Sequence, residues 1–138
     1  MSVRADVLIG GATSGRVLRL DAPISFWGGV DPATSEVTLA GHPQRGERIA
    51  GLILVVPRLI GSSSSSAVML ELLHGVRAPA ALILGQRDAI LPIGVIAARQ
   101  MGWPTIPVLV VADPPYITGT SLMISETGLI ENNQAASG

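Results

Sequence analysis

Residues 49–85 read IAGLILVVPRLIGSSSSSAVMLELLHGVRAPAALILG and carry the pattern from which the fold can be inferred. The stretch holds two apolar runs, residues 49–56 and 80–84, without the polar alternation of a half-exposed strand. Such runs predict strands that are covered on both faces. Between them the pattern predicts a helix from about Ser65 to His74, with a serine at its cap and Gly75 at its stop.

The same succession continues towards the C-terminus. A second helix is expected over about residues 92–101, because Pro92 suits a first helical turn and Gly102 suits a helix stop. A strand over residues 106–111 follows it. The front half has mostly β character, with strands expected at residues 7–9 and 16–20. Together these elements predict an α/β domain arranged in β/β/α layers.

The composition limits the classes of function. The 138 residues suit one domain, expected to cover residues 1–138 with a polar tail from about residue 131. A net charge of −1 without a basic patch argues against a nucleic-acid partner. No cysteine is present to serve as a nucleophile, disulfide or cluster ligand. Apolar runs such as residues 52–56 are too short to span a membrane, and no signal-peptide core is visible. A cytoplasmic protein is expected.

Five serines, Ser62 to Ser66, stand between the first strand and the helix. A flexible serine-rich linker is one interpretation. The run is short, however, and Gly61 before it permits a tight backbone at a strand-to-helix junction. Such a junction gathers N–H groups and hydroxyls where the helix dipole favours an anion. An ordered anion- or substrate-binding loop is the favoured interpretation, and plain capping is its main alternative. A catalytic serine is less favoured from the residues alone, since no base stands nearby in the sequence.

Other residues add to this candidate. Arg58 directly follows the apolar strand and is placed to meet a carboxylate. The segment SFWGG, from Ser25 to Gly29, holds the only phenylalanine and one of the two tryptophans. A β-turn begun by Asp31, with the aromatic rings in the core, explains part of this region. The paired glycines beside a large ring suggest instead that the backbone comes close to another molecule or segment.

Three further features have structural interpretations. His42 and Arg45 could bind an anion, but a solvated turn is the favoured interpretation of GHPQRGE. His74 is expected to interact with the carbonyls at its helix end, so a Ser–His–Asp triad has little support. GGATSG, residues 10–15, lacks the G-K-[ST] ending of a phosphate loop, and a hairpin turn accounts for it.

Taken in order, several motifs resemble a known family. PISFWGGVDPATSEV, HPQRGERIAGLILVVPRLIGSSSSSAVMLELL, APAALILGQRDAILPIGVIAA and IPVLVV look like the small, swivel-domain subunit of aconitase X. The resemblance covers roughly residues 10–112. The SFWGGVDP segment and the Gly-Ser-Ser loop, in this order and spacing, carry most of it.

The resemblance implies the swivelling β/β/α fold of the aconitase superfamily. It also implies a separate large subunit that carries an iron–sulfur cluster, while this chain itself binds no cofactor. The active site is then expected between the two subunits. Enzymes of the family are hydro-lyases: one branch dehydrates cis-3-hydroxy-L-proline and another dehydrates phosphomevalonate. In the latter the first serine after the loop glycine acts as the base, and the matching residue here is Ser62. The residues expected to bind substrate are Gly61, Ser63, Ser64, Ser65, Arg58, Ser25, Phe26, Trp27, Gly28 and Gly29.

One departure from the family bears on the substrate. Family loops usually read Pro-Arg-Gly-Arg-Gly-Ser or carry a lysine just before the glycine, whereas this chain has Leu59 and Ile60 there. A phosphate-bearing substrate loses a partner, so cis-3-hydroxy-L-proline is the first expectation and phosphomevalonate the alternative. A related small hydroxy acid stays open. So does a swivel-fold binding module without catalysis, and the isolated chain is a candidate for self-association through an uncovered interface.

Overall fold

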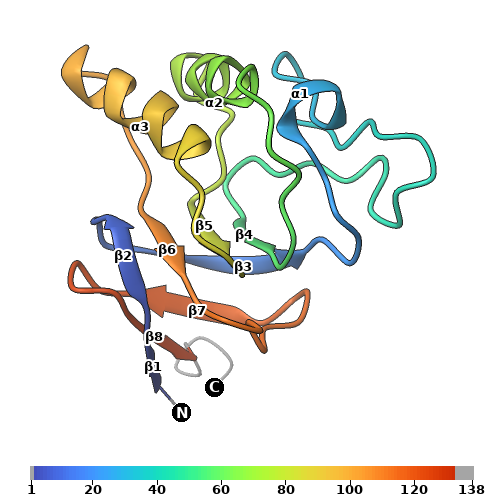
Figure 1. Ribbon diagram of the computed structural model, residues 1–138. Helices are drawn as coiled ribbons and strands as arrows, with labels where there is room; N and C mark the ends of the chain where they lie inside the picture. Colours follow the sequence, from blue (N-terminus) through green and yellow to red (C-terminus); the bar gives the residue numbers. More distant parts are fainter. Residues whose placement is uncertain (1, 133–138) are drawn as a thin grey trace.

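The computed structural model describes residues 2–132 of the chain. These residues form three layers, with helices on one face of a central sheet and a second, smaller β layer on the other face (Figure 1). The β/β/α arrangement expected from the sequence is confirmed.

The central sheet contains parallel strands and one antiparallel edge strand. Its members are β3 (Thr13–Arg19), β4 (Ile53–Val56), β5 (Ala81–Leu84), β6 (Val108–Val110) and the edge strand β2 (Asp6–Ile9). The order β3–β4–β5–β6 is parallel throughout, and β2 pairs antiparallel with β6. All five strands were expected. β4 is shorter than the apolar run 49–56, because Gly51 adopts a φ of 72° and turns the chain before the strand begins.

Three helices cover one face of this sheet: α1 (Phe26–Gly29), α2 (Ser65–His74) and α3 (Ile90–Gln100). α2 agrees with its predicted bounds, and α1 is a single turn that was not expected. α3 begins earlier than predicted, because Asp88 Oδ2 accepts hydrogen bonds from the N–H groups of Ile90 and Leu91 at 3.1 and 2.8 Å. Among the helices of the described chain, none is long and apolar enough to cross a membrane.

α2 ends at His74 with Gly75 as its cap residue, as expected, but the glycine is not the left-handed residue of this ending. Gly75 keeps a φ of −81°, and the left-handed residue is Val76, with a φ of 57°. The Arg77 N–H donates to the Leu72 carbonyl at 2.8 Å, and the Val76 N–H donates to the Leu73 carbonyl at 3.2 Å, which is a Schellman ending. Gly75 therefore precedes the left-handed position, which a strained β-branched residue occupies.

The second β layer was missed in the sequence and comes from both ends of the described chain. It consists of β7 (Ser121–Ile124), β8 (Leu129–Asn132) and β1 (Ser2–Arg4). β8 pairs antiparallel with both of the others. Residues 131 and 132, expected in the polar tail, belong to β8 instead. The rest of the expected tail, residues 133–138, lies outside the described residues.

β3 joins the two β layers. Its first half, residues 13–16, pairs antiparallel with β7, and its second half, residues 17–19, pairs parallel with β4. The expectation of a hairpin at residues 10–15 is therefore wrong. The strand before this segment pairs with β6, and the last residues of the segment already belong to β3.

The buried strands alternate between two cores. Leu54 and Leu82 pack in the core under the helices, whereas Ile53 and Ile83 pack in the core shared with the second β layer. Every residue of β4 and β5 is buried. Because both faces of the strand are covered, the sequence shows an unbroken apolar run instead of alternation. Each such side chain contributes about 1.5–3 kcal/mol by leaving water.

Candidate functional site

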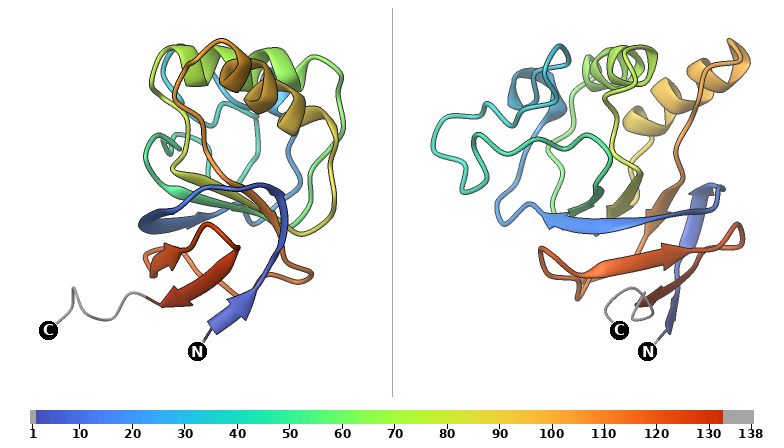
Figure 2. Two further views of the ribbon diagram at one scale, coloured as in Figure 1. Left: turned by 90° about the vertical axis from the view of Figure 1, so that its left-hand side faces the viewer. Right: turned by 180° about the vertical axis from the view of Figure 1, so that it is seen from behind.

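The serine loop, defined as residues 58–64, follows the carboxyl end of β4 and leads into α2 (Figure 2). The loop that follows β5 lies beside it, since the Gly85 N–H donates to the Val56 carbonyl at 3.0 Å. Open α/β sheets bind ligands outside the carboxyl ends of their parallel strands. The serine loop therefore occupies the part of this fold where a ligand is expected.

The five serines divide into two anchored residues and three free ones. Ser65 is buried; its Oγ lies 3.4 Å from Ser25 Oγ and accepts a hydrogen bond from the Trp27 N–H at 3.3 Å. The Ser66 hydroxyl donates to the backbone carbonyl three residues before it at 3.1 Å. The hydroxyls of residues 62–64 make no hydrogen bond to any residue that the structure describes. Ser65 therefore joins the serine loop to the α1 turn, and residues 62–64 leave their hydroxyls available to a ligand.

The backbone of the loop is as open as its side chains. Within residues 2–132, the N–H groups of Gly61 and of the serines at 62–64 donate to no acceptor. Ser64 takes the cap position of α2 in a helical conformation, and its hydroxyl makes no capping bond. Capping by a serine side chain, the alternative from the sequence, is therefore wrong. The Ser65 N–H donates to the Ser62 carbonyl at 3.0 Å, so the run starts the helix instead of forming a linker. Free N–H groups at a helix N-terminus favour an anion.

Gly61 does not have the tight backbone expected from the sequence. Its φ lies outside the left-handed range, and a Cβ built on it would meet no atom within 4 Å. Neither conformation nor packing within the described chain requires a glycine at this position. The space beside Gly61 instead leaves the free N–H groups of the loop accessible to an approaching molecule.

The SFWGG segment meets the first turn of α2 at Ser65, so the two candidate motifs lie together. Phe26 is fully buried, whereas Trp27 is 61% exposed. Gly28 adopts a φ of 79°, and a Cβ on Gly29 would overlap a core isoleucine. The paired glycines thus serve the turn itself. Phe26 can act on a ligand only by supporting the turn from within the core, while Trp27 is presented to the surface.

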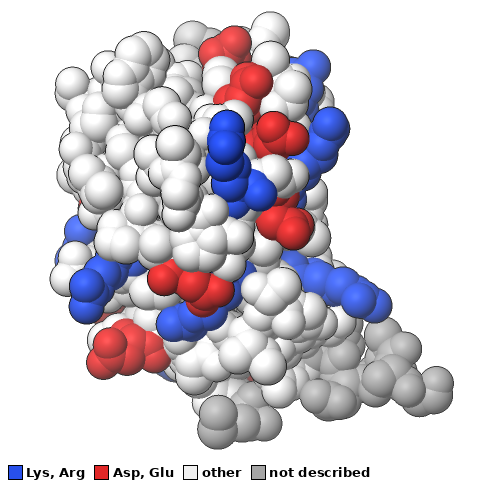
Figure 3. Space-filling model, turned by 90° about the vertical axis from the view of Figure 1, so that its right-hand side faces the viewer, with Lys and Arg blue, Asp and Glu red and all other residues white. Residues whose placement is uncertain are grey.

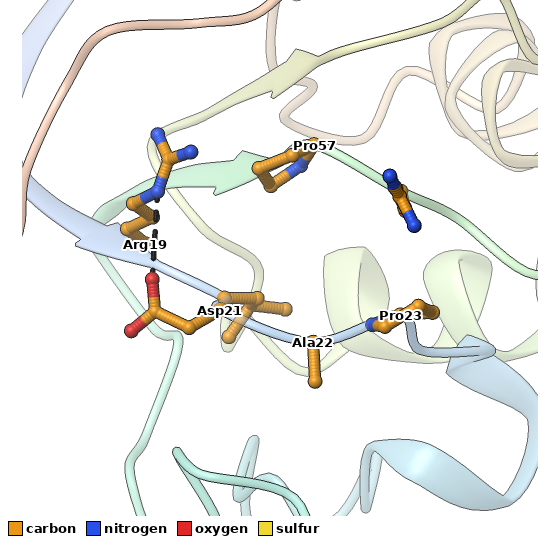
Figure 4. A pocket seen from close by; sticks show the side chains of 7 residues that line it. Arg19, Asp21, Ala22, Pro23 and Pro57 are labelled. Carbon is orange, nitrogen blue, oxygen red and sulfur yellow. Dashed lines mark ion pairs between the residues drawn. The ribbon is translucent and has the colours of Figure 1, made fainter.

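Arg58 lines a pocket of about 170 Å³ at the carboxyl ends of β3 and β4. Figure 4 labels other residues of the same pocket, among them Arg19, Asp21 and Pro57. A second arginine of this pocket, Arg19, is already engaged. Its Nη1 donates to the carbonyls of Pro114 and Tyr116 at 2.6 and 3.0 Å, and its Nε lies 3.4 Å from Asp21 Oδ1. Arg58 is exposed and has no hydrogen bond or ion pair with a described residue. Its guanidinium is therefore available to a carboxylate.

Two glycines that support the serine loop were not singled out from the sequence. A Cβ on Gly94 of α3 would lie 2.5 Å from the Ser66 carbonyl oxygen, and one on Gly85 would overlap the Pro57 carbonyl. Gly94 therefore lets α3 pack closely against the first turn of α2. Gly85 lets the loop after β5 pack against the start of the serine loop. A lone glycine inside a helical pattern was the available signal for Gly94.

Neither histidine belongs to this site. His42 is buried: its Nε2 donates to the Ala22 carbonyl at 3.0 Å, and its Nδ1 accepts the Gln44 N–H at 3.0 Å. The turn around His42 was expected to be solvated, and for this side chain that is wrong. His74 stacks on Trp103, with ring centroids 4.5 Å apart. The Ser–His–Asp triad that had little support from the sequence gains none here.

Among the described residues, neither a metal-binding group nor the buried Tyr116 adds chemistry to the serine loop. Within residues 2–132, no three His, Cys, Asp or Glu side chains gather as a metal-binding group. Burial raises the pKa of Tyr116 above its ordinary value. The Tyr116 hydroxyl is enclosed in the core shared with the second β layer, with no hydrogen-bond partner among residues 2–132. A buried hydroxyl without a hydrogen bond lowers the stability of the core.

Comparison with known proteins adds an independent observation. A family model described as the aconitase X swivel domain matches residues 2–131. The small subunit of phosphomevalonate dehydratase from Thermococcus kodakarensis is 35% identical over 138 residues, which cover 100% of this chain and 93% of that subunit. A crystal structure of Thermococcus kodakaraensis aconitase X in its holo-form matches with a TM-score of 0.86 and 34% identity, over 96% of this chain and 98% of that one.

A further relative is a much longer protein. Cis-3-hydroxy-L-proline dehydratase of Pseudomonas aeruginosa is 42% identical over 101 residues, which are 73% of this chain but only 17% of that protein. Related sequences therefore occur both as a small separate subunit and as a segment of a longer polypeptide.

Proposed function

The chain belongs to the aconitase X swivel-domain family, and from this premise we propose that it is the small subunit of a hydro-lyase. The resemblance and the swivelling β/β/α fold expected from the sequence are confirmed. The proposed enzyme removes water from a small hydroxy acid at a site shared with a large subunit. Similar proteins carrying dehydratase names support this class of reaction.

The observation that carries the proposal is the unused hydrogen-bonding capacity of the serine loop. Four consecutive N–H groups, from Gly61 to Ser64, have no acceptor within the described chain. Among the residues that the structure describes, the hydroxyls of the serines at 62–64 also have no partner. Polar groups that are free at a helix N-terminus and held by an anchored turn are suited to an anionic substrate.

In the proposed reaction the alkoxide of Ser62 removes the proton next to the substrate carboxylate, and the hydroxyl on the adjacent carbon leaves with its bonding electron pair. The proton taken up by Ser62 then passes to the leaving oxygen, which releases water and restores the base. A serine hydroxyl is ordinarily too weak an acid to supply an alkoxide. The free N–H groups of the loop and the positive end of the α2 dipole would stabilise the alkoxide form. The role of Ser62 as a base rests on the match to the family loop, and its accessible hydroxyl supports it.

Arg58 is the proposed partner of the substrate carboxylate. Its guanidinium is free among the described residues and lines the pocket beside the serine loop. A planar guanidinium can hold a carboxylate through two parallel hydrogen bonds, which fixes orientation as well as charge. Residues 61–64 would then receive the reacting end of the substrate, while Ser65 and Phe26 keep the loop and the α1 turn in place.

The substrate we favour is cis-3-hydroxy-L-proline. Leu59 and Ile60 place apolar side chains where family loops carry a basic residue, which leaves a phosphate with fewer partners. Relatives named for cis-3-hydroxy-L-proline and for phosphomevalonate are both similar to this chain, so the choice rests on these two residues. Phosphomevalonate is the alternative substrate.

This chain does not fit an iron–sulfur cluster. It contains no cysteine, and residues 2–132 offer no metal-binding group. The cluster that the family implies is therefore proposed for the large subunit. The cytoplasmic location stays a prediction from the sequence, as does self-association of the isolated chain.

The experiment is anaerobic co-expression with the large subunit from the same organism, followed by co-purification. The complex is then assayed with cis-3-hydroxy-L-proline and with phosphomevalonate. Turnover of the first and not the second supports the proposal, and the reverse establishes the alternative substrate. A stable complex that dehydrates no small hydroxy acid would favour a binding module without catalysis.

A further inference from the structure

Trp27 is the large aromatic side chain that the described chain exposes most. It is 61% accessible, while Phe26 and Tyr116 are buried in the cores and Trp103 is partly covered. An indole carries a large apolar area, and leaving it in water forgoes the free energy of burying that area. Tryptophan is also enriched among the residues that dominate the energy of protein interfaces.

The α1 turn holds Trp27 in one place. The Trp27 N–H donates to the buried Ser65 Oγ at 3.3 Å, and the Val30 N–H closes the turn on the Phe26 carbonyl at 3.2 Å. Gly28 supplies the left-handed φ of 79° that the turn needs. Because the backbone is already held, covering the residue requires ordering of the indole side chain alone.

A hollow of about 500 Å³ lies beside the ring, between the α1 turn and α2. Ala67 and Val68 of α2 give it an apolar lining, and Asp31 and Glu71 add carboxylates to it. The space-filling view shows charged side chains gathered in a band, with uncharged surface beside it at the upper left, over the helical layer (Figure 3). The lining of the hollow is therefore mainly apolar, with two acidic groups beside it.

This chemistry does not suit the carboxylate of the substrate. A small hydroxy acid carries a carboxylate, which Asp31 and Glu71 would repel, and it needs the donors that residues 61–64 offer instead. The two surfaces are nevertheless joined, because Trp27 and the serine loop are both anchored at Ser65, the first residue of α2. A partner that covers Trp27 therefore lies next to the serine loop.

The lengths of the relatives indicate what this partner is. In the Pseudomonas aeruginosa relative the matched segment is 17% of the protein, whereas the Thermococcus kodakarensis small subunit is matched over 93% of its length. The remaining polypeptide of the longer protein corresponds to a separate chain where the small subunit stands alone. The proposed function already requires such a separate chain, namely the large subunit.

Resting on that proposed function, we infer that Trp27 and the hollow beside it are a docking surface for the large subunit. This role replaces the substrate contact that the sequence predicts for Trp27. The surface of the large subunit that meets it is apolar around the indole and basic opposite Asp31 and Glu71. Docking there brings the large subunit to the edge of the serine loop.

The test is the dissociation constant between purified large subunit and four forms of this chain: wild type, Trp27→Ala, Trp27→Phe and Ile96→Ala. Ile96 is a matched control, since it is an apolar side chain of α3 with 49% exposure. Trp27→Ala is expected to raise Kd about 30-fold or more, as for an interface hot spot. Trp27→Phe should recover part of this loss, and Ile96→Ala should change Kd less than about 3-fold.

Each outcome separates the docking role from its alternatives. The melting temperature of each variant is measured as well, so that a change in Kd caused by unfolding is recognised. If the wild type binds and Trp27→Ala binds equally well, the docking role is overturned while the proposed function stands. If Trp27→Ala keeps its Kd but raises KM, Trp27 contacts substrate instead. Absence of any complex with the wild type overturns both.

Discussion

The serine loop and the turn around His42 are both polar turns, but they use their hydrogen-bonding groups in opposite ways. His42 bonds to the Ala22 carbonyl and to the Gln44 N–H, and the Gln44 side chain bonds to both the N–H and the carboxylate of Asp21, at 2.8 and 2.7 Å. The N–H groups and hydroxyls of residues 62–64 have no partner within residues 2–132.

Pairing within the chain is what separates a structural turn from a binding loop. Groups that are paired within the chain stabilise the fold and offer little to a ligand. Groups that are accessible and unpaired add little to stability and can bind a substrate at low reorganisation cost. Composition alone does not distinguish the two, because serine, histidine and glutamine are polar in both settings.

The largest expected effect is that of Ser62→Ala in the complex. Removing the proposed base should lower kcat by about 10²- to 10⁴-fold, the usual contribution of acid–base catalysis. The melting temperature of the chain should stay the same, because this hydroxyl has no partner in the described structure. Steady-state kinetics and thermal denaturation of the same preparation measure both quantities.

Ser66→Ala is the matched control for that variant. It removes a hydroxyl from the same run, but one that donates to the Ser63 carbonyl at 3.1 Å. We expect kcat to stay within a few-fold of wild type, at a cost of about 0.5–1.5 kcal/mol in the free energy of unfolding. Equal loss of kcat in both variants would assign the effect to the loop as a whole and contradict a special role for Ser62.

The next largest effect is expected for His42→Ala, which removes a side chain that is fully paired instead of one that is free. Loss of this buried ring leaves the Ala22 carbonyl and the Gln44 N–H without their partners, so we expect the free energy of unfolding to fall by about 2 kcal/mol. The kcat of the complex should not change. Urea denaturation measures the first and the assay measures the second, with Arg45→Ala, an exposed change in the same turn, as control. A stable His42→Ala variant with lost activity would place His42 in the site.

The smallest effect is expected for Tyr116→Phe, because the hydroxyl of this tyrosine is neither paired, as in the turn around His42, nor accessible, as in the serine loop. Tyr116→Phe removes a buried hydroxyl that has no partner among the described residues, so stability should stay equal or rise by up to about 1 kcal/mol. Since burial raises the pKa of Tyr116, the wild type should lose stability as the pH rises above about 10, and the variant should not. Parallel losses of stability in both proteins above that pH would contradict this account.

The sequence was sufficient for the central part of the fold. Residues 53–56 and 81–84 form unbroken apolar runs because two cores cover them, and that pattern is visible in one dimension. β1, β7 and β8 escaped notice, because each is short and partly exposed, and pairing between distant segments creates them. Val76 escaped notice for another reason: a glycine next to it offered the usual helix stop.

For the site, the two motifs were visible but not the way they are joined. The serine run and the SFWGG segment stood out by composition. Their meeting at Ser65, and the close packing at Gly94, depend on how α3 and the α1 turn lie against α2. The exposure of Trp27 beside a buried Phe26 also follows only from the direction of the turn.

One detail of the second β layer reaches beyond the site. Ser2 lies opposite Glu131 in the pairing of β1 with β8, so both ends of the described chain leave the molecule at the same layer, away from the helices (Figure 1). A peptide linker attached at either end would not have to cross the serine loop or the α1 turn. A fusion or a split of genes could therefore change how many polypeptides make up such an enzyme and leave the geometry of its active site as it was.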